Sequence, residues 1–115
     1  MNNEAKRRLQ HALDACYLIN QFVSGRTLED YESDEMLRAA VERKFEIIGE
    51  ALNQAEIADE TVSDDIPDLR QIVGLRNRII HGYEVIDNEL IWRVTEVNLP
   101  RLTQQLESLL GKSSL

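Results

Sequence analysis

The sequence has little of three things: cysteine, aromatic residues and long apolar runs. Its only cysteine, Cys16, has no partner for an internal disulfide, which is typical of a reducing compartment. No apolar run approaches the roughly 18 residues that a membrane-spanning helix needs, and the first residues are not followed by the apolar stretch of an export signal. Aromatic residues make up 5% of the chain, so aliphatic residues must supply most of the core. We therefore expect a cytoplasmic protein that does not contact a membrane.

An excess of basic residues is also absent. Thirteen Lys and Arg residues stand against 21 Asp and Glu residues, which gives a net charge of −8. Proteins that coat nucleic acid without sequence preference present a basic face, because they release counterions from many phosphates. The charge argues against that class of protein. It leaves room for a local site, made by few residues, that contacts a phosphate.

What is present is a pattern of apolar residues at helical spacing over most of the chain. A Thr-Leu-Glu-Asp sequence that begins at Thr27 is typical of a helix start and indicates one further short turn. Amphipathic helices with short connections predict an all-α antiparallel bundle of four to five helices, in a single domain over residues 1–115. The predicted helices span residues 4–23, 33 or 34 to about 58, 67–81, and 88 onwards.

The segments between these helices carry their own signals. Residues 59–66 are polar and acidic, which is typical of a loop. Pro67 suits the first position of a helix, with Asp64 or Asp65 as the capping residue. Pro100 lies inside the last helical pattern and should kink that helix.

Two further residues need an interpretation. Cys16 lies on the apolar stripe of the first helix, so a buried structural thiol is expected rather than a nucleophile. His11 lies beside that stripe rather than on it and is expected to face solvent. Lys6 precedes His11 by five residues, which shows that an Arg or Lys at this distance from a His also arises by chance.

The sequence LRNRIIHGYE, residues 75–84, is unusually polar for the end of a helix. Arg76 occupies the place between Val73 and Ile80 on the predicted apolar stripe. Arg76 and His81 are five residues apart, or about 140° around a straight helix. They can meet at one ligand if Gly82 lets the helix end distort, or if a second subunit faces the first. The spacing alone leaves a basic helix end as the alternative to a site.

The segment from Arg76 to Tyr83, RNRIIHGY, matches the Arg-Asn-x3-His-x-Tyr motif and resembles the HEPN-domain proteins, specifically the HepT-like toxins. The resemblance extends over about residues 5–110. VERKFEIIGEALNQ, residues 41–54, is similar to the family's second helix with its Gly-Glu-Ala element. One departure is Asp68, because many relatives carry tryptophan after the proline. We expect that difference to affect packing.

The resemblance implies a metal-independent endoribonuclease without a cofactor, the toxin of a toxin–antitoxin system, with Arg76 and His81 as catalytic residues in the cleft of a homodimer. The residue types suit this chemistry. Histidine moves protons near neutral pH, and arginine presents a permanently charged fork to phosphate oxygens. Each chain has one histidine in the motif, so two subunits would supply both a base and an acid. Asn77 is expected to orient the imidazole or to contact the phosphate.

The resemblance gives Tyr83 a separate role. The antitoxin of such pairs, an MntA-type nucleotidyltransferase, transfers AMP to the tyrosine of the motif, and a bulky anion there would repel RNA. A half-buried aromatic residue at the helix end is the alternative. Glu46 and Glu50 are expected to pair with Arg43, to face the partner, or to be solvated.

Two other functions remain open from the sequence. The bundle could be a non-catalytic, nucleotide-binding partner subunit of a minimal nucleotidyltransferase, which the net charge of −8 favours. It could also be a dimerisation module without chemistry. An intact Arg-Asn-x3-His-x-Tyr motif favours the ribonuclease, because a scaffold needs neither the arginine nor the histidine.

Overall fold

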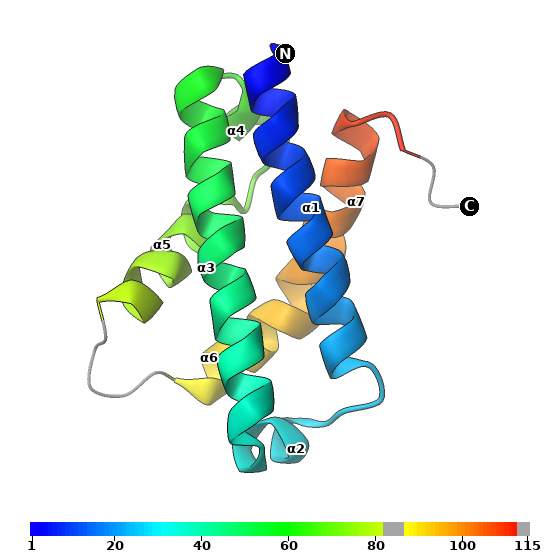
Figure 1. Ribbon diagram of the computed structural model, residues 1–115, viewed down its shortest axis with the longest axis vertical. Helices are drawn as coiled ribbons and strands as arrows, with labels where there is room; N and C mark the ends of the chain where they lie inside the picture. Colours follow the sequence, from blue (N-terminus) through cyan, green and yellow to red (C-terminus); the bar gives the residue numbers. More distant parts are fainter. Residues whose placement is uncertain (82–86, 113–115) are drawn as a thin grey trace.

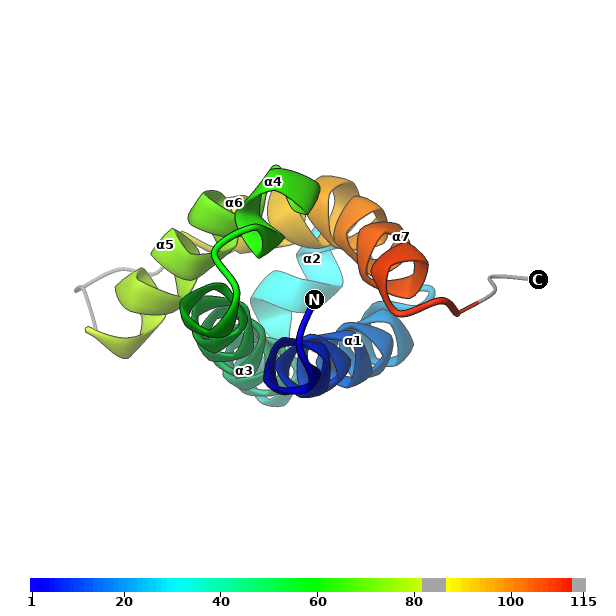
Figure 2. The ribbon, with the colours of Figure 1, turned by 90° about the horizontal axis from the view of Figure 1, so that it is seen from above.

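The computed structural model describes residues 1–81 and 87–112 and shows an all-α bundle over this part of the chain (Figure 1). α1 and α3 are antiparallel neighbours, α5 packs on α3, and α7 packs beside α1 (Figures 1 and 2). This arrangement confirms the predicted antiparallel bundle. The elements are α1 (Asn3–Val23), α2 (Leu28–Ser33), α3 (Glu35–Ala58), α4 (Val62–Asp65), α5 (Leu69–Ile80), α6 (Asn88–Arg93), a π-helical turn (Val94–Asn98) and α7 (Leu99–Leu109).

The helices surround one core that is mainly aliphatic, as the low aromatic content predicts. Its aromatic component is small, and the rings of Tyr31 and Trp92 pack with centroids 5.5 Å apart. Cys16 is fully buried in this core, and burial raises the pKa of its thiol to about 12. Because the thiolate is the reactive form, Cys16 is the structural residue that its position predicts.

The starts of α2 and α3 follow the predicted signals. Thr27 and Asp30 form a reciprocal capping box at the start of α2. Asp34 caps α3 by accepting a hydrogen bond from the backbone N–H of Leu37. The same bond is the main reason that the pKa of Asp34 is lowered. These caps confirm the expected beginnings of both helices.

The predicted loop over residues 59–66 is wrong in one respect, because it contains the short helix α4. Val62 and Ile66, four residues apart, are buried against the core and hold this turn in place. The prediction that α5 begins at Pro67 with an acidic cap is also wrong. Asp64 and Asp65 belong to α4, and α5 begins at Leu69.

The start of α5 is tied to α7 through Asp68. Its side chain caps no backbone N–H and instead accepts two hydrogen bonds from Arg101, at 2.9 and 3.0 Å. Asn98 donates a third, at 3.3 Å. Asp68 is 8% exposed. Directly after Pro67, this chain therefore has a buried carboxylate held by Arg101 and Asn98.

The last helix is kinked, as Pro100 predicts. The break takes the form of a π-helical turn over Val94–Asn98, in which the backbone N–H of Leu99 donates to the carbonyl of Val94. Pro100 follows in the first turn of α7, where its missing N–H is tolerated. Wider turns of this kind absorb the irregularity that a proline introduces into a helix.

Candidate functional site

The buried face of α5 differs from the predicted stripe. The buried residues are Leu69, Ile72, Leu75 and Ile79, whereas Ile80 is 47% exposed. Arg76 therefore lies at the edge of the buried face and does not interrupt it. Its side chain is turned towards α3 and is 26% exposed. Hydration at this edge explains how a charged residue is accommodated there.

Gly49 of α3 makes room for Arg76. A Cβ atom at position 49 would overlap the Cβ of Arg76, would lie 2.8 Å from its Cγ, and would approach the carbonyl oxygen of Ile72 to 3.4 Å. Glycine is unfavourable inside a helix, so its presence in the middle of α3 needs a packing reason. The close approach of α5 to α3 at Arg76 supplies that reason.

The guanidinium of Arg76 is held from two sides. Its Nη2 donates to Glu50 Oε2 at 2.6 Å, and its Nη1 donates to the Asn77 side-chain oxygen at 2.8 Å. Its Nε is buried and has no hydrogen-bond partner among the described residues. Glu46 pairs with Arg43 at 3.0 Å, which is one of the alternatives expected for this residue. The pairing of Glu50 with Arg76 was not predicted. Gly49, a glycine in the middle of α3 next to Glu50, was a sequence signal that another helix approaches closely here.

His81 directly follows α5 and keeps helical backbone angles, φ −76° and ψ −3°. Its backbone N–H donates to the Asn77 carbonyl at 3.0 Å, and the residue is exposed. The helix is thus not distorted between Arg76 and His81, which leaves the angular separation expected of a regular helix. Gly82 and Tyr83 lie outside the described residues, so the predictions for both are unaffected by the structure.

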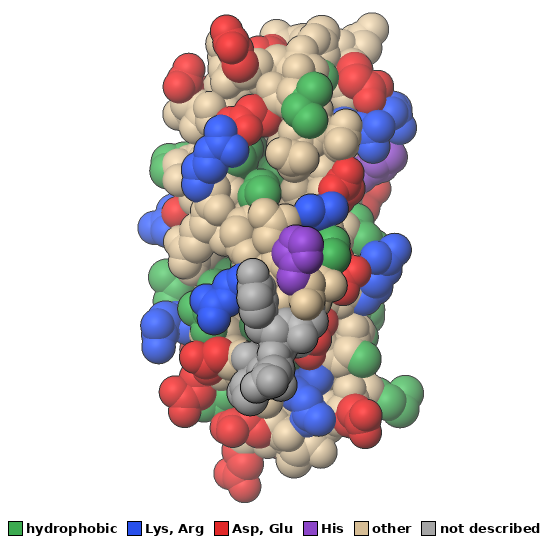
Figure 3. Space-filling view, turned by 90° about the vertical axis from the view of Figure 1, so that its left-hand side faces the viewer, with side chains coloured by type: hydrophobic (Ala, Val, Ile, Leu, Met, Phe, Trp, Pro, Cys, Tyr) green, Lys and Arg blue, Asp and Glu red, His purple; other side chains and the backbone are tan. Residues whose placement is uncertain are grey.

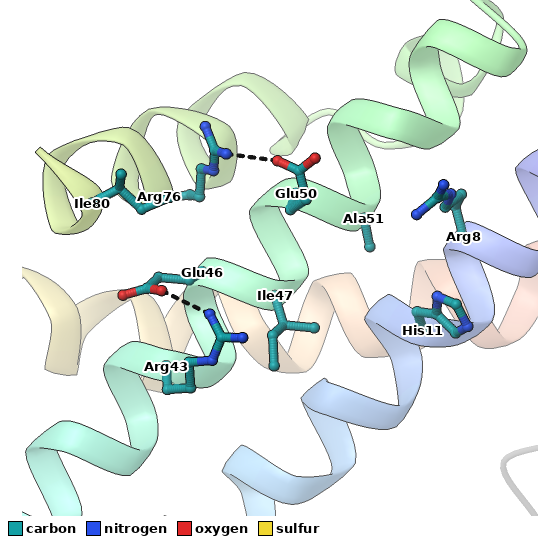
Figure 4. Close-up of a pocket in the computed structure, with 9 residues that line it drawn as sticks. All are labelled: Arg8, His11, Arg43, Glu46, Ile47, Glu50, Ala51, Arg76 and Ile80. Atoms are coloured by element: carbon teal, nitrogen blue, oxygen red, sulfur yellow. Dashed lines mark hydrogen bonds and ion pairs between the residues drawn. The ribbon is translucent and has the colours of Figure 1, made fainter.

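Arg76 lines an open pocket of about 300 Å³ between α1, α3 and α5 (Figure 4). Ile80 forms part of the same wall, and His81 is the next residue in the chain. His81 itself is not among the described residues that line it. His11, for which no role was expected, does line the pocket. The complete lining is Arg8, His11, Arg43, Glu46, Ile47, Glu50, Ala51, Arg76 and Ile80.

The surface near the end of α5 mixes charges of both signs (Figure 3). Within the ranges 1–81 and 87–112, no group of three or more His, Cys, Asp or Glu side chains is arranged to hold a metal ion. None of the helices described is both long enough and apolar enough to span a membrane.

Comparison with known proteins assigns the class of this helical bundle. A family model described as Ribonuclease HepT-like matches residues 12–109. A protein of Caldanaerobacter subterraneus subsp. tengcongensis named "Putative RNase" is 31% identical over 104 residues, which cover 90% of this chain and 92% of the relative. A "Probable ribonuclease HepT" of Thermococcus cleftensis is 29% identical over 109 residues, covering 95% and 98% of the two chains. No solved structure matches the chain significantly.

The chain therefore belongs to the Ribonuclease HepT-like family, as the resemblance predicted. This membership assigns the chain to the ribonucleases.

Proposed function

We propose that the protein is a metal-independent endoribonuclease and the toxin of a toxin–antitoxin pair, with Arg76 and His81 as its catalytic residues. The family match supports the activity. The observation that carries the assignment of residues is the placement of Arg76. A half-buried guanidinium, held by Glu50 and Asn77 at the wall of an open pocket, is prepared to bind a phosphate.

The proposed reaction uses the RNA's own 2′-hydroxyl as nucleophile. A histidine accepts the 2′-hydroxyl proton, the 2′-oxygen forms a bond to phosphorus, and the bond from phosphorus to the 5′-oxygen breaks. A second histidine protonates the departing 5′-oxygen. Arg76 stabilises the extra negative charge on the phosphate oxygens. The products are a 2′,3′-cyclic phosphate, which hydrolyses to a 3′-phosphate, and a 5′-hydroxyl.

A homodimer is the proposed active form. The regular geometry of α5 through His81 supports this, because Arg76 and His81 of one chain are directed to different sides of the helix. A facing copy would bring the His81 of one subunit to the Arg76 of the other. It would also supply the second histidine that an acid and a base together require.

Regulation through Tyr83 is part of the same proposal. Its phenolic oxygen would attack the α-phosphate of ATP on a cognate MntA-type nucleotidyltransferase, with pyrophosphate as the leaving group. The AMP adduct would place a negative charge two residues from His81 and so oppose binding of RNA.

The first prediction concerns cleavage. The purified protein should cleave RNA in EDTA and leave 2′,3′-cyclic or 3′-phosphate ends. His81→Ala and Arg76→Ala should each reduce the rate by about a hundredfold or more, because each removes a group that acts on the reacting phosphate. Arg78→Ala is the matched control for Arg76→Ala, because it removes the same charge from the same helix, and it should cleave RNA like the wild type. Circular dichroism checks folding. Cleavage by His81→Ala at the wild-type rate would refute the assignment.

The second prediction concerns modification. After incubation with the partner enzyme and ATP, mass spectrometry should show one AMP on Tyr83 and loss of RNA cleavage. Tyr83→Phe should retain cleavage and gain no AMP, because it keeps the ring and lacks the accepting oxygen. An adduct at another residue, or none at all, would refute this part of the proposal.

The alternative of a non-catalytic nucleotide-binding subunit is favoured by the net charge of −8. It predicts nucleotide binding at Arg76 without cleavage of any RNA. The cleavage assay therefore separates the two functions.

A further inference from the structure

The pocket beside Arg76 has a second basic wall that the motif does not include. Arg8 and His11, three residues apart on α1, face it from one side, and Arg43 of α3 faces it from another (Figure 4). Residues three or four apart on a helix share a face, so α1 presents both groups together. His11 is exposed, as expected, and it also lines this pocket.

The pocket is locally basic in an acidic chain. Three arginines line it, Arg8, Arg43 and Arg76, against two carboxylates, Glu46 and Glu50. The chain as a whole carries a charge of −8. A concentration of positive charge against this background favours an anionic ligand at this place over the rest of the surface.

Arg8 and Arg43 each form an ion pair within their own helix. Arg8 pairs with Glu4 at 2.9 Å and Arg43 with Glu46 at 3.0 Å. The Arg43 side chain is 67% exposed, and the Arg8 side chain is 30% exposed. Exposed pairs of this kind contribute little free energy, and an arginine has five N–H donors. Both side chains therefore retain donors for a ligand while their orientation is restrained.

The remaining lining of the pocket is apolar. Ile47 and Ala51 of α3 lie between the basic residues, and Ile80 of α5 adds a half-exposed surface at the edge. Apolar surface bordered by arginines suits a nucleotide, whose base and ribose cover the apolar part while its phosphate meets the guanidinium groups.

We propose that this pocket binds a nucleotide of the RNA substrate next to the cleaved phosphodiester, with Arg8, His11 and Arg43 contacting its phosphate. The pocket is placed next to the proposed catalytic site because Arg76 belongs to both and because Ile80, which lines the pocket, immediately precedes His81. The inference rests on the proposed ribonuclease function. It adds three RNA-binding residues, from α1 and α3, that are not part of the motif.

Arg7 and Arg8 provide a matched pair for the test. Both bond to Glu4, at 2.8 and 2.9 Å, but only Arg8 lines the pocket. Binding of a labelled single-stranded RNA is measured by fluorescence anisotropy in the non-cleaving His81→Ala protein. Arg8→Ala should weaken binding about tenfold, since a charged hydrogen bond to phosphate is lost. Arg7→Ala should change it less than about twofold, because the same surface pair is lost without a ligand contact.

Arg43 gives a second comparison, with its neighbour Lys44 as the control outside the pocket. Each phosphate contact adds about 0.7 to the slope of log affinity against log salt for a single strand. Arg43→Ala should therefore lower this slope by about 0.7, whereas Lys44→Ala should leave it nearly unchanged. His11→Ala should weaken binding in the same direction as Arg8→Ala. Circular dichroism of each variant confirms that the helices are retained.

The outcomes distinguish the two proposals. If the wild type cleaves RNA and the pocket variants bind it like their controls, the pocket proposal is overturned and the ribonuclease stands. If the variants bind RNA normally and lose binding to a partner protein instead, the pocket is a protein-docking site and the proposal is equally overturned. If the wild type binds RNA through these residues without cleaving it, the pocket proposal is supported as an RNA site and the catalytic assignment fails.

Discussion

The two ends of α5 each carry an arginine–carboxylate pair, and the pairs serve different purposes. At the start of the helix, Asp68 is 8% exposed and accepts from Arg101 and Asn98. Near its end, Arg76 meets Glu50 through a single nitrogen, and the Glu50 side chain is 44% exposed. The first pair is closed, because its buried carboxylate has its acceptors occupied. The second is open, because it positions a guanidinium and leaves donors for a ligand.

The largest effect on stability is expected at the closed pair. Arg101→Ala leaves the buried Asp68 carboxylate with Asn98 alone and should lower the free energy of unfolding by about 2 kcal/mol. Asp68→Ala should lower it by only about 1 kcal/mol, because Arg101 is half exposed and regains water. Urea denaturation followed by circular dichroism measures both. RNA cleavage by the folded variants should match the wild type, and a loss of cleavage without a loss of stability would contradict the comparison.

A smaller effect is expected where α3 meets the open pair. Gly49→Ala would place a Cβ against Arg76, so overpacking should outweigh the gain in helix propensity and lower the free energy of unfolding by about 1 kcal/mol. Cleavage should fall as Arg76 is displaced.

Gly74→Ala is the matched control for this change. A Cβ at Gly74 meets nothing within 4 Å, so this substitution should raise the free energy of unfolding by up to about 1 kcal/mol and leave cleavage intact. A gain in stability from both substitutions would show that the contact at Gly49 relaxes easily.

The smallest effect on stability is expected at Glu50. Glu50→Ala should change the free energy of unfolding by less than about 1 kcal/mol, because the pair is partly solvated. It should nevertheless reduce kcat/KM for RNA cleavage about tenfold, because Arg76 loses the group that positions it. Glu50→Gln keeps an acceptor for Arg76 and should recover most of that loss.

Glu56→Ala provides the control for Glu50. Glu56 also joins α3 to an arginine of α5, Arg70, at 2.8 Å, but it lies outside the pocket. Its loss should leave kcat/KM unchanged. Equal losses in both variants would mean that Glu50 acts by attaching α5 to α3 and not by positioning Arg76.

Much of the fold was predictable because local signals decide it. The helical spacing of apolar residues, the helix-start signature at Thr27 and the helix start near residue 34 depend on residues close in sequence, and the structure confirms them. The start of α5 was mispredicted because Pro67, with an acidic residue before it, satisfies the local rules for a helix start two residues earlier than Leu69. Asp68, which directly precedes the helix, instead pairs with Arg101, a residue that is distant in sequence and leaves no local signature.

The site shows the same division. The motif residues Arg76, Asn77 and His81 could be singled out from a short segment. Their surroundings could not, because Glu50 comes from α3 and contacts Arg76 only after folding, and Arg8 comes from α1 and lines the same pocket. His11 was judged from the stripe of its own helix, which does not reveal what α3 and α5 place opposite it. Gly49 was the one signal in the sequence that two helices approach closely at this point.

The contact between Gly49 and Arg76 also has an evolutionary consequence. Position 49 is constrained by the close approach of α5, because a Cβ there would overlap the Cβ of residue 76, an atom that every residue except glycine carries. Replacing Arg76 with alanine would leave this overlap in place, because alanine keeps the Cβ and removes only the Cγ and the atoms beyond it. The glycine is therefore a requirement of the distance between the two helices, and it should be needed whether or not residue 76 is an arginine.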